Sequence, residues 1–166
     1  MTTEQKFEAG WNLMMEACKE GDYGDPFSYA RSREILMAIK LGHKVAPTLS
    51  GADGFDSEGE CEYKSTISNF INATYNGISV FDTWEDQVDY LIKEKIKKYK
   101  NHYFARFTTD LSNPIAEVWK MDGDNVYNLL LPKLKKKYLK ENKGKDPRLG
   151  ASLSKKEIYE YAERIF

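Results

Sequence analysis

The sequence contains few of the residues that build disulfide frameworks or zinc sites. It has two cysteines, Cys18 and Cys61, and two histidines, His43 and His102. So few ligands cannot form a zinc site of the usual spacing, and two cysteines fit a reduced compartment. No apolar run approaches the length of a membrane span, and the N-terminus lacks a basic and then apolar secretion signal. We therefore expect a cytoplasmic protein with no membrane partner.

Apolar and aromatic residues, in contrast, are abundant. Hydrophobic residues make up 41% of the chain and aromatic residues 13%, which is typical of a folded globular protein. The length of 166 residues is sufficient for one domain with a real core. No internal repeat or linker divides the chain, so we predict a single domain over residues 1–166.

The charges are unevenly distributed, although the net charge is only −1. Residues 1–92 hold 16 acidic and 7 basic side chains, whereas residues 93–166 hold 10 acidic and 18 basic side chains. A basic half could approach phosphates while an acidic half holds a metal ion. Solvated, lysine-rich helices would produce the same asymmetry.

Five carboxylates and one lysine lie within residues 50–66, around a predicted turn. The turn is Asp56-Ser57-Glu58-Gly59, in which the glycine can adopt a positive φ. Apolar or aromatic residues alternate with charged ones after it, which predicts a β-hairpin. On the second strand the period of two places Glu62 and Lys64 on one face and Cys61 on the other.

This hairpin has the composition of a hydrolytic metal site. Carboxylates held close together repel one another and need a cation or a raised pKa. Mg²⁺ prefers oxygen ligands and is usually held by only one or two carboxylates, and an ammonium group beside it can orient a water or offset charge on a phosphate. Asp53 precedes the turn and reaches the face of Glu62 if the register brings the two together. Asp56 is the rival candidate.

These residues carry a resemblance to a known family. Asp53, followed by Glu62-Tyr63-Lys64 after a short hairpin, resembles the motif of the PD-(D/E)XK nucleases, which include type II restriction endonucleases. Gly51-Ala52-Asp53 stands where the family has Pro-Asp, a departure that weakens the pattern.

The resemblance implies a set of site residues. Asp53, Glu62 and the backbone carbonyl of Cys61 would hold Mg²⁺, with Mn²⁺ as a substitute, and Lys64 would be the catalytic lysine. Glu34, on the preceding predicted helix, stands where a further glutamate often joins the site in that family.

Simpler explanations remain open for the same residues. An exposed hairpin with alternating Glu and Lys is often only a solvated strand face, and an acidic loop can bind calcium, although the spacing fits no EF-hand. Arg31 and Glu34 are spaced for a surface ion pair.

A run of lysines follows the last predicted strand. With Tyr138 interleaved, it is the best candidate for a phosphate-contacting surface, although such runs are often only solubilising. The predicted DNA-binding residues are Lys133, Lys135, Lys136, Lys137 and Lys140, and the run continues to Lys143 and Lys145. Residues 65–80 are expected to form an irregular strand and loop that could lie against DNA.

Helical and strand periodicities alternate along the chain. Helices are predicted over residues 3–20 and 26–42, from Thr83, from residue 126 into the lysine run, and from Ser154 to the C-terminus. Strands are predicted over residues 43–47, in the hairpin, and over residues 102–108 and 115–121. This order predicts an α/β fold, a three-layer α/β/α sandwich around a central mixed β-sheet, like that of restriction endonucleases.

The expected function is Mg²⁺-dependent hydrolysis of phosphodiester bonds in double-stranded DNA at a specific sequence. One site per chain implies a homodimer for cutting both strands. Two alternatives stay open: a phage or repair nuclease of the same fold that reads DNA structure, and a non-catalytic nucleic-acid-binding protein.

Overall fold

The computed structural model describes residues 1–47, 51–140 and 148–166. The predicted loop over residues 48–50 and the lysines Lys143 and Lys145 lie outside the described residues. Within the described residues the chain forms a mixed α/β fold, which confirms the predicted class. Its five helices there are α1 (Thr3–Gly21), α2 (Arg31–Leu41), α3 (Trp84–Tyr90), α4 (Gly123–Tyr138) and α5 (Lys155–Tyr161). After α3 the chain continues as a π-helical turn, Leu91–Lys95.

The central sheet is mixed, and in the described part of the chain it has six strands. These are β1 (Lys44–Val45), β2 (Gly54–Asp56), β3 (Gly59–Thr66), β5 (Asn101–Phe107), β6 (Ile115–Asp122) and β8 (Glu163–Arg164), in the order β1-β2-β3-β5-β6-β8. β3 and β5 run parallel, and the other neighbours are antiparallel. A parallel pair needs a long crossover connection, and α3 lies within the one between these strands.

Capping signals that the sequence shows set the starts of α1, α3 and α5. The Thr2 side chain accepts a hydrogen bond from the backbone of Gln5 and completes a capping box at α1. Thr83 caps α3, and Ser154 forms a second capping box at α5. A cap satisfies backbone N–H groups that have no partner inside the helix, so these starts were predictable from the sequence.

Three predicted helix boundaries are wrong. The fourth helix begins at Gly123 and not at residue 126, because the Asp122 side chain accepts the Asn125 N–H and caps the helix. The second helix begins at Arg31 and not at residue 26, because Asp25 Oδ1 accepts the Phe27 N–H in a local turn and Tyr29 has a φ of 48°. A left-handed residue cannot continue a right-handed helix. The last helix ends at Tyr161 and not at the C-terminus, because Ala162 is extended and the chain then pairs with β6 as β8.

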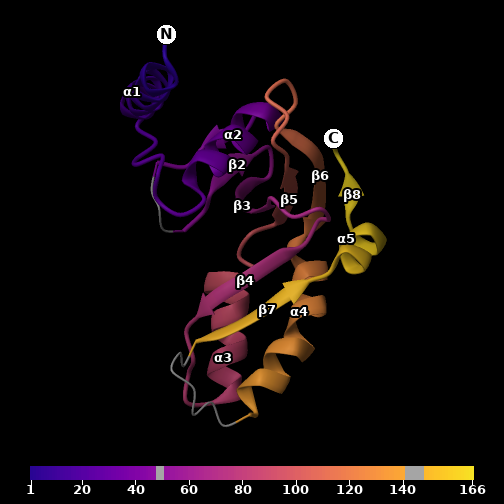
Figure 1. The fold of residues 1–166 in the computed structure, drawn as a ribbon. Coiled ribbons are helices and arrows are strands. Elements are labelled where there is room, and N and C mark those ends of the chain that lie inside the picture. Colours follow the sequence, from indigo (N-terminus) through magenta and orange to yellow (C-terminus); the bar gives the residue numbers. More distant parts are fainter. Residues whose placement is uncertain (48–50, 141–147) are drawn as a thin grey trace.

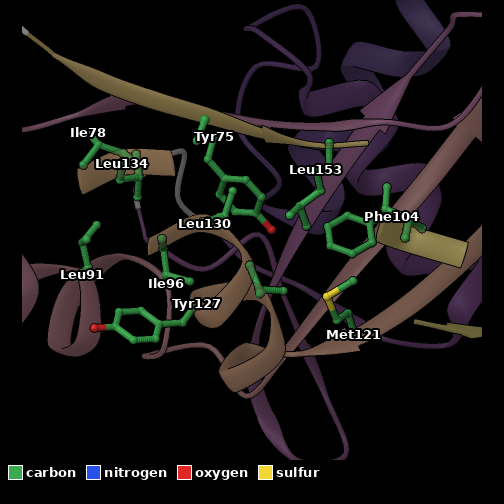
Figure 2. Packing of buried hydrophobic residues seen from close by; sticks show 14 of the residues in the cluster. Tyr75, Ile78, Leu91, Ile96, Phe104, Met121, Tyr127, Leu130, Leu134 and Leu153 are labelled. Atoms are coloured by element: carbon green, nitrogen blue, oxygen red, sulfur yellow. The ribbon is translucent and has the colours of Figure 1, made fainter. Parts of the chain in front are cut away.

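A second, two-stranded sheet consists of β4 (Ala73–Ile78) and β7 (Leu149–Leu153), which run antiparallel. β4 lies within residues 65–80, where an irregular strand and loop was predicted, and its pairing with β7 shifts between Tyr75 and Ile78. Figure 1 shows β4 and β7 crossing in front of α3 and α4. Tyr75 of β4 points into the cluster that includes Leu130 and Leu153 (Figure 2).

The two hydrophobic clusters contain side chains from opposite faces of the central sheet. One cluster joins Phe104 to residues of β4, β7 and α4. The other joins Cys61 and Tyr63 of β3 to residues of α2. Because side chains alternate along a strand and Lys64 is the register partner of Phe104, Lys64 lies on the face that β4 covers. The predicted split of the β3 side chains between two faces is therefore confirmed.

The N-terminal helix α1 stands away from the rest of the molecule (Figure 1). Of its residues, all of which the structure describes, Cys18 is the one that is buried. Its other large apolar side chains are exposed, namely Phe7, Trp11, Leu13, Met14 and Met15. No helix within the described ranges is long and apolar enough to cross a bilayer.

Candidate active site

The register of the β2–β3 hairpin brings Asp53 next to the Glu62 segment. Gly54 pairs with Cys61, so Asp53 is the next residue along the ladder. Its backbone N–H donates to the Cys61 carbonyl at 3.1 Å, and its Oδ2 accepts the backbone N–H of Tyr63 at 2.7 Å. The sequence-based condition for Asp53 to join Glu62 is therefore met.

Asp53 is held among other carboxylates in a largely buried position. Burial raises its pKa, and the nearby carboxylates of Glu62 and Glu34 raise it further, to about 8, although Lys64 acts in the opposite direction. Burial also raises the pKa of Glu34, an effect that Arg31 and Lys64 partly offset. The three carboxylates and the lysine therefore interact electrostatically. Glu34 lies on α2, Asp53 in the connection between β1 and β2, and Glu62 and Lys64 on β3.

Lys64 is paired with Glu62 at the centre of this group. Its ammonium donates a hydrogen bond to Glu62 Oε1, and the two side chains are 25% and 11% exposed. Burial alone would lower the pKa of Lys64, but the charges of Glu62, Asp53 and Glu34 outweigh it and raise the pKa. Lys64 is therefore a fixed cation suited to stabilising negative charge, and not a neutral amine base.

Asp56, the rival metal ligand, belongs to a different network. Its Oδ1 accepts the Glu58 N–H, and its Oδ2 accepts hydrogen bonds from Asn101 and from the Tyr103 hydroxyl. Burial acts to raise the pKa of Asp56, but these hydrogen bonds dominate and lower it. Its acceptor positions are thus occupied within the fold, whereas Asp53 is the aspartate beside Glu62.

Cys61 contributes backbone and packing to the site. Its carbonyl accepts the Asp53 N–H in the strand ladder, and its fully buried side chain packs with residues of α2. Burial raises the pKa of its thiol to about 12, so the thiol is protonated. The assignment of its carbonyl as a metal ligand stays a prediction.

The Arg31–Glu34 ion pair forms, but Arg31 is not on the surface as the spacing had suggested. Its side chain is 1% exposed and lies 3.5 Å from Glu34 Oε2. It also donates hydrogen bonds to the carbonyls of Tyr23 and Ala46. Arg31 therefore ties the start of α2 to both neighbouring segments and holds Glu34 near Asp53.

Two residues of the site were not found by sequence reasoning. The Lys64 ammonium lies 5.1 Å from the ring centroid of Tyr75, within the range of a cation–π contact. The Tyr75 hydroxyl bonds to Nδ1 of His102, whose Nε2 donates to the Ile96 carbonyl. Burial lowers the pKa of His102 to about 4, so its ring is neutral and its Nδ1 accepts a hydrogen bond from the Tyr75 hydroxyl. The sequence predicted an irregular strand in this region but gave no signal that Tyr75 would meet Lys64.

The described residues do not form a dedicated multi-ligand metal cage. Among the described residues, no group of three or more His, Cys, Asp and Glu side chains is arranged to hold a metal ion. Mg²⁺ needs only one or two carboxylates, since waters and substrate phosphates complete its shell. Asp53 and Glu62 provide two carboxylates. The negative charge of Asp53 is disfavoured by burial and by the neighbouring carboxylates, and a bound cation would offset that effect.

The predicted DNA-binding lysines point in several directions. Lys133 donates to the Ser152 carbonyl and to Glu157, and Lys137 donates to the Gly150 carbonyl. Lys135 lies 5.6 Å from the ring centroid of Trp84, while Lys136 and Lys140 are exposed. The run is thus not one continuous surface, and its contact with DNA stays a prediction.

Comparison of the chain with protein-family models gave no match, and comparison with curated protein sequences gave none either. Any functional assignment therefore depends on the geometry of the site.

Proposed function

We propose that this protein is a Mg²⁺-dependent endonuclease that hydrolyses phosphodiester bonds of double-stranded DNA, of the type II restriction endonuclease kind. The observation that carries the proposal is the convergence of Asp53, Glu62 and Lys64 on one side of the hairpin, with Glu34 beside them. The finer fold assignment, a three-layer α/β/α sandwich like that of restriction endonucleases, is part of the same proposal. Helices on both faces of the mixed sheet support it.

Asp53 and Glu62 would hold the Mg²⁺ ion, with Glu34 next to them and Mn²⁺ as a substitute. When bound, the ion would polarise a phosphoryl oxygen and lower the pKa of a water. The same binding would relieve the repulsion that raises the pKa of Asp53. The residues present therefore fit the ion that the resemblance implies.

Lys64 supplies a positive charge where charge builds up on the phosphate. Its position is fixed by Glu62 on one side and by the Tyr75 ring on the other. A charge that is already oriented needs no reorganisation during the reaction. The neutral His102 holds the Tyr75 hydroxyl and so keeps that ring in place.

The experiment is to incubate supercoiled plasmid with the protein in Mg²⁺, in Mn²⁺ and in EDTA, with Lys64→Ala and Lys100→Ala variants alongside. Lys64→Ala should reduce cleavage by about 100-fold or more and leave DNA binding largely intact. Lys100→Ala removes an exposed lysine that pairs with Glu58 in the Asp56 network, and it should cleave like the wild type.

The pattern of products separates the candidate functions. Discrete fragments indicate a restriction endonuclease, while nicking or smearing indicates a nuclease that reads DNA structure. DNA binding without any metal-dependent cleavage would leave a non-catalytic nucleic-acid-binding protein. Cleavage by Lys64→Ala within tenfold of wild type would refute the role given to Lys64.

A further inference from the structure

A cavity of about 640 Å³ lies between the α1–α2 connection and the β4–β7 sheet. Its lining includes Tyr29, Asn76, Gly77, Lys137, Arg148 and Gly150. Tyr29 belongs to the connection that leads into α2, which carries Glu34, and Asn76 follows Tyr75 on β4. β4 therefore contributes Asn76 and Gly77 to the Tyr29 cavity and Tyr75 to the candidate active site.

The charged side chains of the Tyr29 cavity are positive. Lys137 and Arg148 line it, and no Asp or Glu among the described residues does. A cavity of about 650 Å³ beside α1 is lined instead by Glu16, Asp22 and Asp25. A concave wall of one sign concentrates ions of the opposite sign, so the Tyr29 cavity favours an anion.

A β-bulge shapes one wall of the cavity. The pairing of β4 with β7 shifts between Tyr75 and Ile78, and Gly77 has a φ of +67°. Arg148 Nη1 lies 3.5 Å from the point where a Cβ on Gly77 would be. Bulges re-aim side chains next to functional sites, and this one brings the Arg148 guanidinium close to the β4 backbone.

Tyr29 lines the opposite side of the cavity and is unusual in both its exposure and its backbone conformation. Its side chain is 100% exposed, so packing within the fold does not explain an aromatic ring here. Its φ of 48° is uncommon for a bulky residue. An exposed ring beside two cations provides both stacking and phosphate contacts, the combination that binds nucleic acid.

We infer that the Tyr29 cavity binds the phosphodiester backbone of nucleic acid, with Lys137 and Arg148 on phosphates and Tyr29 against a base or sugar. This inference rests on the proposed function and selects Lys137 from the predicted lysine run. Duplex DNA and a single-stranded segment share this chemistry, and both are included in the test.

The test measures binding by fluorescence anisotropy in EDTA, where metal-dependent cleavage cannot occur. Labelled duplex and labelled single strand are titrated at several salt concentrations with Lys137→Gln/Arg148→Gln. The matched control is Lys6→Gln/Lys156→Gln, which removes the same charge from exposed positions outside the cavity and outside the predicted lysine run. Two lost phosphate contacts should flatten the log–log salt dependence on duplex DNA by up to about 1.8, and the control should leave it unchanged.

Equal slopes for the two double variants would overturn the inference. Tyr29→Ala provides an independent measurement, because a fully exposed side chain does not hold the fold together. It should weaken binding at least about fivefold on whichever strand form occupies the cavity, and Tyr29→Phe should retain stacking. Unchanged affinity of Tyr29→Ala on both forms would also overturn the inference.

Failure of the inference is distinguishable from failure of the proposed function. A wild-type protein that cleaves plasmid, while both double variants bind alike, refutes the cavity and leaves the nuclease. A protein whose binding depends on Lys137, Arg148 and Tyr29 but which cleaves nothing in Mg²⁺ refutes the nuclease and leaves the cavity. A wild-type protein that binds neither strand form in EDTA refutes the cavity.

Discussion

At the scale of the single residue, the stability of the fold and the proposed chemistry make opposite demands on Asp53. The fold favours a neutral side chain in this buried place, whereas metal binding needs the charged carboxylate. Its charged form is disfavoured by burial and by the neighbouring Glu62 and Glu34. A protein without a use for the carboxylate would be more stable with a neutral side chain in this place. Asp56, three residues away, is the reverse case, because its hydrogen bonds favour the charged form.

The two aspartates should therefore respond in opposite ways to substitution by asparagine. Because the pKa of Asp53 is raised from 3.8 to about 8, its contribution to stability is fully present below pH 3.8. It is lost as the pH rises through about 8. Asp53→Asn keeps the oxygen that accepts the Tyr63 N–H, and metal-free protein should gain of the order of 2 kcal/mol at pH 8 and almost nothing at pH 4.

Thermal unfolding across this pH range in EDTA provides the measurement, with Asp56→Asn as the comparison. Asp56→Asn should lower the melting temperature near neutral pH, since it weakens three hydrogen bonds to a charged acceptor. In Mg²⁺, Asp53→Asn should lose cleavage more completely than Asp56→Asn. A stable, active Asp53→Asn beside an inactive Asp56→Asn would transfer the ligand role to Asp56.

At the scale of elements, β4 brings residues from a distant part of the sequence to the site. It pairs with β7, far away in the sequence, and its buried side chains alternate with exposed ones. This arrangement places the Tyr75 ring beside the Lys64 ammonium and the Asn76–Gly77 bulge at the Tyr29 cavity. β4 therefore contributes residues both to the candidate active site and to the lining of the Tyr29 cavity.

The ring of Tyr75 and its hydroxyl should make separable contributions to cleavage. Tyr75→Leu removes the cation–π contact with Lys64 and should reduce cleavage about tenfold. Tyr75→Phe keeps the ring and loses only the hydrogen bond to His102, so it should retain more of the activity. The rates are compared in single-turnover assays at saturating Mg²⁺, with melting temperatures recorded for both variants. Equal rates for the two variants would show that the ring has no role beyond packing.

At the scale of the whole molecule, α1 contacts the rest of the fold through Cys18, which is buried, and through Trp11, whose ring stacks on Phe27 with 3.7 Å between the centroids. Much of its apolar face is nevertheless exposed. Phe7, Trp11 and Met14 recur at the spacing of one helix face, and they are 71%, 44% and 39% exposed. Exposed apolar faces of this kind mark interaction surfaces. The proposed endonuclease would need two sites to cut both strands, so we propose that this face joins two copies of the chain.

Light scattering coupled to size-exclusion chromatography tests this proposal. The wild-type protein should elute as a dimer, and the double variant Phe7→Glu/Met14→Glu should shift it to monomer, because charges on this face would be buried at the interface. Leu13→Glu is the control, since Leu13 is 65% exposed and lies off that face. A monomeric wild-type protein that still linearises plasmid would contradict a dimer through α1.

Much of the local structure could be predicted from the amino-acid sequence, because local interactions decide it. The caps at Thr2, Thr83 and Ser154 depend on a side chain and a backbone group three residues apart. The hairpin and the opposite faces of Cys61 and Lys64 follow from a turn and the strand period of two. The candidate set Asp53, Glu62 and Lys64 was available from the same pattern.

Tertiary contacts determine features that local patterns leave open. They place Asp53 beside Glu62, and they place Asp56 against Asn101, a residue 45 positions away in the sequence. The burial of Arg31, the pairing of β4 with β7 and the Tyr29 cavity likewise arise from segments distant in the chain. Burial and electrostatic coupling depend on every neighbour in space, and a sequence pattern shows only the neighbours along the chain.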